Sequence, residues 1–384
     1  MTSKETQQQK TDIFDDVVIG SSPLMLVQAG LLAREGRKVC LLERQSRLGG
    51  SWQTAILENG DAVEIACHLI EFFPGVYEFL EGASNTPFIA LDAQPIRIHQ
   101  TGLAFPYFSR MLMLATGVRL SIGWAKARLD WMRGTAPDRN RLINFETKLS
   151  SYLRHQIPAF FQRPIMQGPK HGFVDFMDRL IARTRTDGVV IRAADISSLT
   201  RKADNRWSLQ CEDGHVVAAE HIHCTTSTNL RQVSAGRFEA TAQEFAHRLC
   251  VVAEVLNEDV KISQTYVAFW KNPTVARISR IDMPTSEPVQ RFLVEFHNAR
   301  PDADPEWHLV VRSHMERAKI IAKGGVVKIV GQVDCLFSTN VDQLPAGEID
   351  TNLWGYYSSG NLAAGLAAWR KTERLPQLTR SDAP

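Results

Sequence analysis

The segment from Phe14 to Glu43, FDDVVIGSSPLMLVQAGLLAREGRKVCLLE, decides the fold. Residues 14–20 have the composition of a short buried strand. Residues 21–36 carry apolar side chains at helical spacing and end in Gly36, a common helix stop. A second apolar strand, KVCLLE, ends at Glu43. Strand, tight turn, helix and strand within about 30 residues predict a βαβ unit of the Rossmann type.

The turn after the first strand is the expected site for the pyrophosphate of a dinucleotide, because a helix N-terminus offers free N–H groups and a favourable dipole. Of the GxGxxG fingerprint only Gly20 is present, with Ser22 and Met25 at the other glycine positions. Glu43 follows Gly20 by 23 residues, where a carboxylate would hold ribose hydroxyls. We expect Gly20, Ser21, Ser22 and Glu43 to contact the nucleotide. A βαβ unit that binds none is the alternative.

The run after the second strand, ERQSRLGGSW, contains a glycine pair that lets the backbone pass close to a ligand. With this run, the pattern V-V-I-G…G-R-K-V-C-L-L-E-R…R-L-G-G-S-W resembles the flavin amine oxidase superfamily, which includes protoporphyrinogen oxidase, phytoene desaturases and UDP-galactopyranose mutase. The resemblance implies that the cofactor is FAD and that the run lies along it. The cofactor-binding residues implied there are Arg44, Arg47, Gly49, Gly50, Ser51 and Trp52.

Later segments extend the resemblance. PKHGFVDFMDRLI, from Pro169, is similar to the family segment before the second FAD contact, and GVVIRAADISSL, from Gly188, implies that Ile196 lies near the adenine. AAEHIHCTTS, from Ala218, is similar to the strand that returns to the nucleotide domain. Near the C-terminus, LWGYYSSGNL stands where the family has a glycine–acid pair. The cofactor contacts implied there are Gly355, Gly360, Asn361 and Leu362.

Two residues are candidates for catalysis. His68 matches a mutase histidine beside the isoalloxazine ring, although Glu71 replaces the second histidine of that segment. Arg277, in RISRIDM, is a candidate ligand for an anionic substrate, and strand alternation places Arg280 on the opposite face.

Composition excludes several classes of protein. The 384 residues include 44 basic and 42 acidic side chains, without the basic excess expected for nucleic-acid binding. Six scattered cysteines without a CxxC pair indicate buried free thiols, and His221 and His223 have no evident third ligand, so we expect no metal.

The N-terminus lacks the layout of a signal peptide and no apolar stretch is long enough to span a membrane, so we expect a cytoplasmic protein.

Residues 110–133 predict a helix that combines basic and aromatic side chains. The set is Arg110, Arg119, Lys126, Arg128 and Arg133 with Trp124 and Trp131. Such a helix suits contact with a membrane surface. A helix that caps the substrate domain is the preferred interpretation, because Gly117 and Gly123 interrupt a single amphipathic face.

The predicted fold class is α/β, with a Rossmann-type FAD-binding domain interleaved with an α+β substrate domain that contains a mixed β-sheet. Residues 61–109 are expected to form loops and short strands, and WHLVVRS at 307–313 is expected to be a strand. The expected divisions are a disordered tail (1–11), the FAD-binding domain (12–65 and 166–235), a substrate or helical cap region (66–165), the substrate sheet (236–345) and a C-terminal FAD-contacting helix and tail (346–384).

The predicted function is an FAD-dependent oxidoreductase that removes a hydride from a small or biosynthetic substrate. Two alternatives remain open: a mutase-like, non-redox flavoprotein acting on a nucleotide sugar, and a degenerate nucleotide-binding assembly subunit without its own catalysis. A small-molecule substrate is expected, and the sequence does not indicate an oligomeric state.

Overall fold

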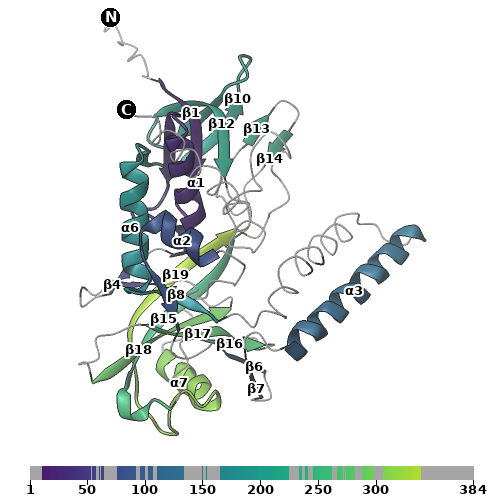
Figure 1. Cartoon of the computed structure of the whole chain (residues 1–384), viewed down its shortest axis with the longest axis vertical. Helices are drawn as coiled ribbons and strands as arrows, with labels where there is room; N and C mark the ends of the chain where they lie inside the picture. The colour runs from purple at the N-terminus through teal and green to yellow at the C-terminus, as the bar shows by residue number, and fades with distance from the viewer. Residues whose placement is uncertain are drawn as a thin grey trace, which may run out of the picture.

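The computed structural model contains two large β-sheets, two small two-stranded sheets and a long helix that stands away from both large sheets (Figure 1). It describes residues 11–52, 54–57, 60, 62–64, 76–91, 96–99, 103–106, 110–133, 149, 153, 165–224, 233–235, 238–240, 245–261, 266–270, 272, 274–281, 288–297 and 306–338.

The first sheet has eight strands in the order β14-β13-β10-β11-β12-β1-β2-β9. Strands β12, β1, β2 and β9 run parallel to one another, and their apolar runs suit strands that are covered on both faces. The pair β10–β13 is parallel as well. The strands are β1 (Thr11–Ile19), β2 (Val39–Glu43), β9 (Val190–Ala193), β10 (Ile196–Arg201), β11 (Trp207–Cys211), β12 (Val216–Cys224), β13 (Val233–Ala235) and β14 (Phe238–Ala240).

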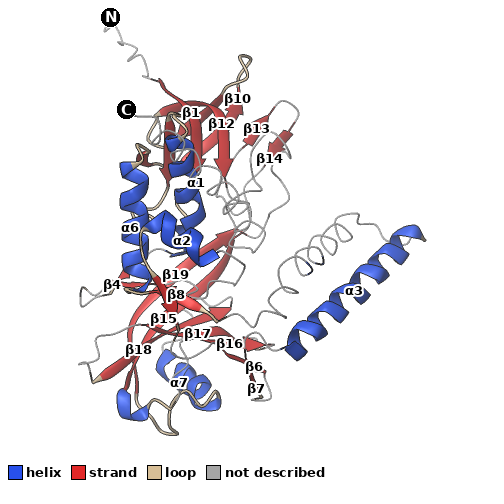
Figure 2. Ribbon diagram, viewed as in Figure 1, coloured by secondary structure: helices blue, strands red, loops and turns tan. Residues whose placement is uncertain are grey.

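Three helices cover one face of this sheet (Figure 2): α1 (Pro23–Arg34), α2 (Val76–Ser84) and α6 (Gly172–Thr186). They pack with Val18 and Leu41 of the sheet, while Phe14, Val17 and Trp207 belong to a second core on the other face. The predicted βαβ unit and the predicted elements of 168–224 are confirmed, including the hairpin that turns at Asp213–Gly214.

The second sheet has seven strands in the order β19-β15-β18-β17-β16-β6-β7. It is antiparallel except where β16 pairs in parallel with β6, so the predicted mixed sheet is confirmed. The strands are β6 (Ile96–His99), β7 (Ala104–Pro106), β15 (Phe245–Leu256), β16 (Tyr266–Trp270), β17 (Val275–Ile281), β18 (Val289–His297) and β19 (Val327–Ser338).

The two faces of the second sheet have different covers. Helix α7 (Trp307–Arg317) packs on one face. The other face meets the hairpin of β3 (Thr54–Ile56) and β4 (Ala62–Glu64) through Leu57 and Val63. The smaller elements are η1 (Gly50–Trp52), η3 (Asn257–Asp259) and the paired strands β5 (Phe88–Ala90) and β8 (Gln167–Pro169).

Three sequence predictions were wrong. WHLVVRS begins α7, because Trp307, Val311 and Met315 recur at helical spacing and are buried together. Residues 76–84 form α2, which packs in the first core rather than in a cap region. The boundary at 235 divides the hairpin of β13 and β14, and both strands belong to the first sheet.

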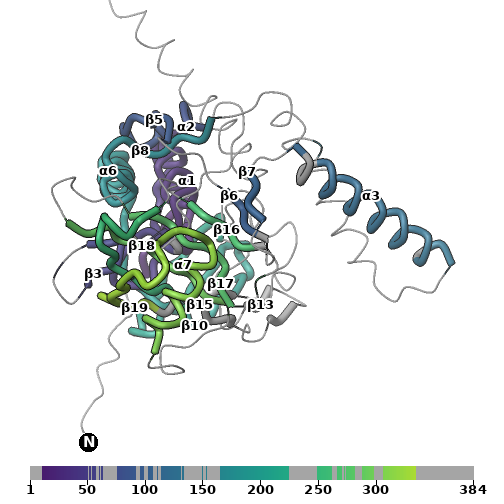
Figure 3. Tube along the Cα trace, turned by 90° about the horizontal axis from the view of Figure 1, so that it is seen from below, coloured from purple at the N-terminus to yellow at the C-terminus, as the bar shows by residue number. Residues whose placement is uncertain are grey.

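The predicted helix at 110–133 is confirmed as α3 (Arg110–Met132). It lies beside the second sheet rather than over it, as Figures 1 and 3 both show, so it does not cap that sheet. No helix in the described part of the chain is long and apolar enough to cross a membrane.

Candidate functional site

The turn between β1 and α1 has the form of an anion site. Gly20 adopts φ +96°, a conformation that favours glycine, and a Cβ there would meet nothing within 4 Å. Helix α1 begins at Pro23, whose missing N–H costs nothing in a first turn. Ser22 precedes it, and its buried Oγ has no hydrogen-bond partner among the described residues. A buried hydroxyl without a partner is costly, so Ser22 fits a ligand oxygen at this helix end.

Ser21 connects the three segments that were predicted to contact the nucleotide. Its N–H and its hydroxyl both donate to Glu43 Oε2, at 2.9 and 2.6 Å. Its Oγ accepts a hydrogen bond of 2.9 Å from the N–H of Gly49. The turn, the end of β2 and the glycine pair are therefore held together before any ligand binds. No pattern in the sequence indicated this connecting role, because a serine after Gly20 is typical of any small turn.

Gly50 completes this arrangement by close approach. Its φ is +57°, and a Cβ would lie 3.2 Å from both the N and the Cα of Ser22. Only glycine fits here without displacing backbone. The prediction that the glycine pair lies close to a ligand thus gains a geometric basis: the pair packs directly on the turn.

Glu43 lies at the centre of the candidate site and is 8% exposed. Its Oε1 accepts a hydrogen bond of 3.0 Å from the N–H of Gln45. A carboxylate oxygen has two lone pairs, so Oε1 has capacity for a ribose hydroxyl. The backbone oxygen of Glu43 accepts a hydrogen bond of 2.8 Å from Ala194, which precedes Ile196 by two residues. The segment implied to meet the adenine therefore reaches the end of β2, although the Ile196 side chain is buried in the core.

The other residues of the ERQSRLGGSW run have different surroundings. Arg44 and Arg47 are exposed, and Arg47 donates to the backbone oxygen of Thr54 at 2.9 Å. The Trp52 indole is buried, with its ring 5.1 Å from that of Phe173 in an edge-on contact. Trp52 thus stabilises the first core with its side chain. Ser51 directly precedes Trp52 in η1.

Arg277 lies on the second sheet, and its guanidinium forms an ion pair with Glu295 of β18, which is 2% exposed. The Glu295 carboxylate neutralises the positive charge with which Arg277 was expected to bind an anionic substrate. The sheet register places Arg97 and Arg277 on either side of Ala268. Ser279, two residues on, is buried, and its Oγ has no hydrogen-bond partner in the described part of the chain. The strand face around Arg277 is therefore polar as well as buried.

His223 belongs to a buried polar cluster beneath α1 rather than to a metal site. Its Nε2 lies 2.7 Å from Asp16 Oδ1, and its Nδ1 lies 3.0 Å from Gln28 Nε2. Arg37 forms a further ion pair with Asp16. Burial alone would raise the pKa of the Asp16 carboxyl, but hydrogen bonds from His223 and Arg37 outweigh it and lower that pKa. His221 is exposed. Within the described ranges, no group of three His, Cys, Asp or Glu residues could hold a metal ion.

The described cysteines match their prediction. Cys40, Cys211, Cys224 and Cys250 are buried thiols. Burial raises the pKa of Cys40 to about 12, which removes it as a nucleophile near neutral pH. Several predicted site residues lie outside the described residues: His68, Glu71, Gly355, Gly360, Asn361 and Leu362.

Comparisons with known proteins identify the first domain and the overall fold. Residues 18–81 match the family of NAD(P)-binding Rossmann-like domains. No curated protein matches the sequence. Among solved structures, cyclohexylamine oxidase from Brevibacterium oxydans is 11% identical with a TM-score of 0.59, and the likeness covers 94% of this chain and 99% of that one. Putrescine oxidase bound to putrescine is 11% identical with a TM-score of 0.57, covering 95% of this chain and 100% of that one.

The chain shares the overall fold of these two oxidases. The resemblance inferred from the sequence is thereby confirmed at the level of the fold, with a dinucleotide-binding Rossmann unit at its start. The same fold occurs in the Rab GDI from Plasmodium falciparum, which is 10% identical with a TM-score of 0.53 over 95% of this chain and 98% of that one. The fold alone therefore does not specify a reaction.

Proposed function

We propose that the protein is an FAD-dependent oxidoreductase that removes a hydride from a small or biosynthetic substrate. The observation that carries the proposal is the buried, unpartnered Ser22 hydroxyl at the N-terminus of α1, with Gly50 packed against the same residue. The N-terminal end of α1, a hydroxyl donor and open space at Gly20 together suit a pyrophosphate. The oxidases that share the fold support the choice of a flavin.

Each segment of the site has a role toward such a cofactor. The turn at Gly20–Ser22 would bind the pyrophosphate, and Glu43 Oε1 would accept a ribose hydroxyl. The Gly49–Gly50 backbone would border the cofactor on the side of the turn. When bound, FAD supplies a two-electron acceptor for the hydride of a substrate C–H bond, and an external acceptor reoxidises it. The chain itself orients the substrate and excludes water.

The test is a titration of the purified, full-length protein with FAD, followed by absorbance and by calorimetry, with ADP and NAD as comparison ligands. Wild type should bind FAD and develop the flavin absorbance band, and ADP should compete. Gly50→Ala should weaken FAD binding by about tenfold or more, because its Cβ meets the Ser22 backbone.

Gly60→Ala is the matched control. Gly60 also has a positive φ, +87°, but a Cβ there meets nothing within 4 Å. The Gly60→Ala variant should therefore carry similar backbone strain and leave the affinity for FAD unchanged. Protein that stays colourless after reconstitution, and that binds neither FAD nor ADP, would contradict the proposal.

A non-catalytic nucleotide-binding subunit is the second candidate. Ser22 and Met25 in place of glycines favour it, as does the occurrence of the fold in a Rab GDI. Bound FAD that no candidate substrate reduces under anaerobic conditions would support this reading. The redox-neutral alternative on a nucleotide sugar rests on His68 and Arg277. This alternative is distinguished by measuring the oxidant consumed per substrate converted: a redox-neutral reaction would consume none.

A further inference from the structure

Helix α3 carries a row of large apolar side chains on its surface. The row consists of Leu114, Val118, Ile122, Leu129 and Met132. With 3.6 residues per turn these positions fall on one face of the helix. Each side chain is between 40% and 64% exposed, although α3 is an ordered helix of 23 residues. Ala127, on a different face, is only 5% exposed. The helix therefore has a more buried side and an exposed apolar side.

In the sequence, Gly117 and Gly123 interrupt a single amphipathic face of this helix. The structure shows instead that the apolar residues of α3 divide between two faces. Trp124 and Leu120 are partly buried near the Ala127 side, whereas the row from Leu114 to Met132 is exposed. The exposed row is therefore distinct from the more buried side of α3.

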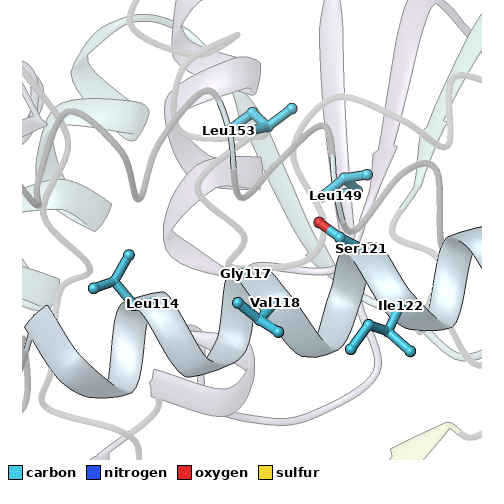
Figure 4. A pocket seen from close by; sticks show the side chains of 7 residues that line it. All are labelled: Leu114, Gly117, Val118, Ser121, Ile122, Leu149 and Leu153. Atoms are coloured by element: carbon cyan, nitrogen blue, oxygen red, sulfur yellow. The ribbon is translucent and has the colours of Figure 1, made fainter.

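A neighbouring segment widens the apolar surface. Leu149 and Leu153 lie across from Leu114, Val118 and Ile122, as Figure 4 shows. Together with Gly117 and Ser121 these side chains line an open groove of about 350 Å³. Leu153 is itself 50% exposed. Contiguous exposed apolar surface of this kind marks an interaction site, whereas single exposed residues are ordinary.

Basic side chains flank the exposed row on both edges. Arg119, Lys126 and Arg133 recur every seven residues along one edge, and Arg110 and Arg128, 18 residues apart, fall on the other edge. All five are exposed. Residues 110–133 contain five basic side chains and one acidic side chain, Asp130, so this helix is strongly positive in a chain whose net charge is only +2.

We propose that α3 binds the surface of an anionic lipid bilayer, with the Leu114–Met132 row inserted at the acyl boundary and the flanking basic groups at the headgroups. An apolar stripe bordered by Lys and Arg is the pattern of an interfacial helix. The helix stands clear of both sheets, so a flat surface can reach it (Figures 1 and 3). A second copy of the chain is disfavoured as the occupant, because two such helices would oppose their like charges.

The test is co-sedimentation of the full-length protein with vesicles, which needs neither cofactor nor turnover. Wild type should bind vesicles of phosphatidylglycerol and phosphatidylcholine, bind pure phosphatidylcholine more weakly, and lose affinity as salt is raised. Val118→Glu/Ile122→Glu should reduce binding by about tenfold or more. The matched control is Val326→Glu, an exposed apolar position outside α3, which should bind like wild type.

A second variant separates the two parts of the surface. Arg119→Glu/Lys126→Glu keeps the apolar row and reverses two charges. It should lose about 25-fold or more in binding to anionic vesicles and little toward neutral ones. All variants are checked by circular dichroism for retained folding.

Absence of vesicle binding by wild type would overturn the proposal. So would equal binding by wild type and Val118→Glu/Ile122→Glu. Light scattering tests the alternative that a second copy of the chain binds this face. If wild type is an oligomer and Val118→Glu/Ile122→Glu converts it to a monomer, the face binds a second copy instead of a membrane.

Discussion

At the scale of single residues, Ser22 offers a way to separate binding from folding. Its buried hydroxyl lacks a partner among the described residues, so it contributes nothing to the ligand-free fold. Ser22→Ala should leave the free energy of unfolding of the ligand-free protein unchanged or slightly raised. It should weaken FAD binding by about tenfold, because a hydrogen bond to a charged group is lost. Calorimetry and urea unfolding on the same samples measure both quantities.

Ser21→Ala is the instructive comparison for that experiment. Ser21 donates to Glu43 and accepts from Gly49, so its loss should lower the stability of the ligand-free protein as well as the affinity. If Ser22→Ala also destabilised the ligand-free protein, its hydroxyl would have a structural partner, and the assignment of that hydroxyl to a ligand would be wrong.

At the scale of elements, helix α7 carries a pH-sensitive group. Burial, together with the nearby charge of Arg317, lowers the pKa of His314 from its usual 6.5. The unfolded chain therefore takes up a proton below pH 6.5 that the folded protein resists. Stability should fall as pH drops from 6.5 toward the lowered pKa, and it is fully present above 6.5.

The variant His314→Asn removes this effect. Urea unfolding from pH 8 to pH 5 should show a shallower loss of stability below pH 6.5 in His314→Asn than in wild type. His308→Asn, an exposed imidazole on the same helix, controls for the loss of a histidine from α7. Parallel curves for wild type and His314→Asn would show that His314 titrates alike in the folded and unfolded states.

The same scale shows why some elements were predictable from the sequence. The βαβ unit and the α6–β12 segment have local signals that agree with their tertiary surroundings, such as Gly36 after α1 and Asp213–Gly214 in the hairpin. For α7, the apolar run Leu309–Val311 masked the helical spacing of Trp307, Val311 and Met315. For α2, prolines before and after the helix favoured a loop prediction, although the helix has a short apolar face. Tertiary packing decided both cases.

The candidate site was predictable in its members but not in its connections. Gly20, Glu43 and Gly49–Gly50 follow from strand ends and turn chemistry. The contact between Gly50 and Ser22, and the role of Ser21, depend on how two loops meet in space. No local pattern encodes such a contact. The placement of α3 is a similar case: its composition suits both a cap and a surface helix, and the preferred capping interpretation is not the one that the structure shows.

At the scale of the whole molecule, Leu57 and Gly331 join the nucleotide-binding part to the second sheet. Leu57 follows β3 and packs with Val252 and Leu293 of that sheet. Gly331 lies on β19 beside a register shift, and a Cβ there would lie 2.4 Å from Leu57 Cδ2. The absence of a side chain at 331 therefore lets the two parts approach. Because β3 follows the Gly49–Gly50 run that packs on the turn between β1 and α1, this contact also positions the second sheet relative to the candidate site.

A double-mutant cycle tests this contact. Gly331→Ala should destabilise the protein by about 1–3 kcal/mol through overpacking, and Leu57→Ala by about 2–5 kcal/mol through lost burial. In the double variant the smaller side chain at 57 makes room for the new methyl group. Gly331→Ala should then cost much less, which gives a coupling energy on the order of 1 kcal/mol or more in urea unfolding. Strictly additive costs would mean that the new methyl group at position 331 is accommodated elsewhere and that Leu57 does not set the spacing of the two parts.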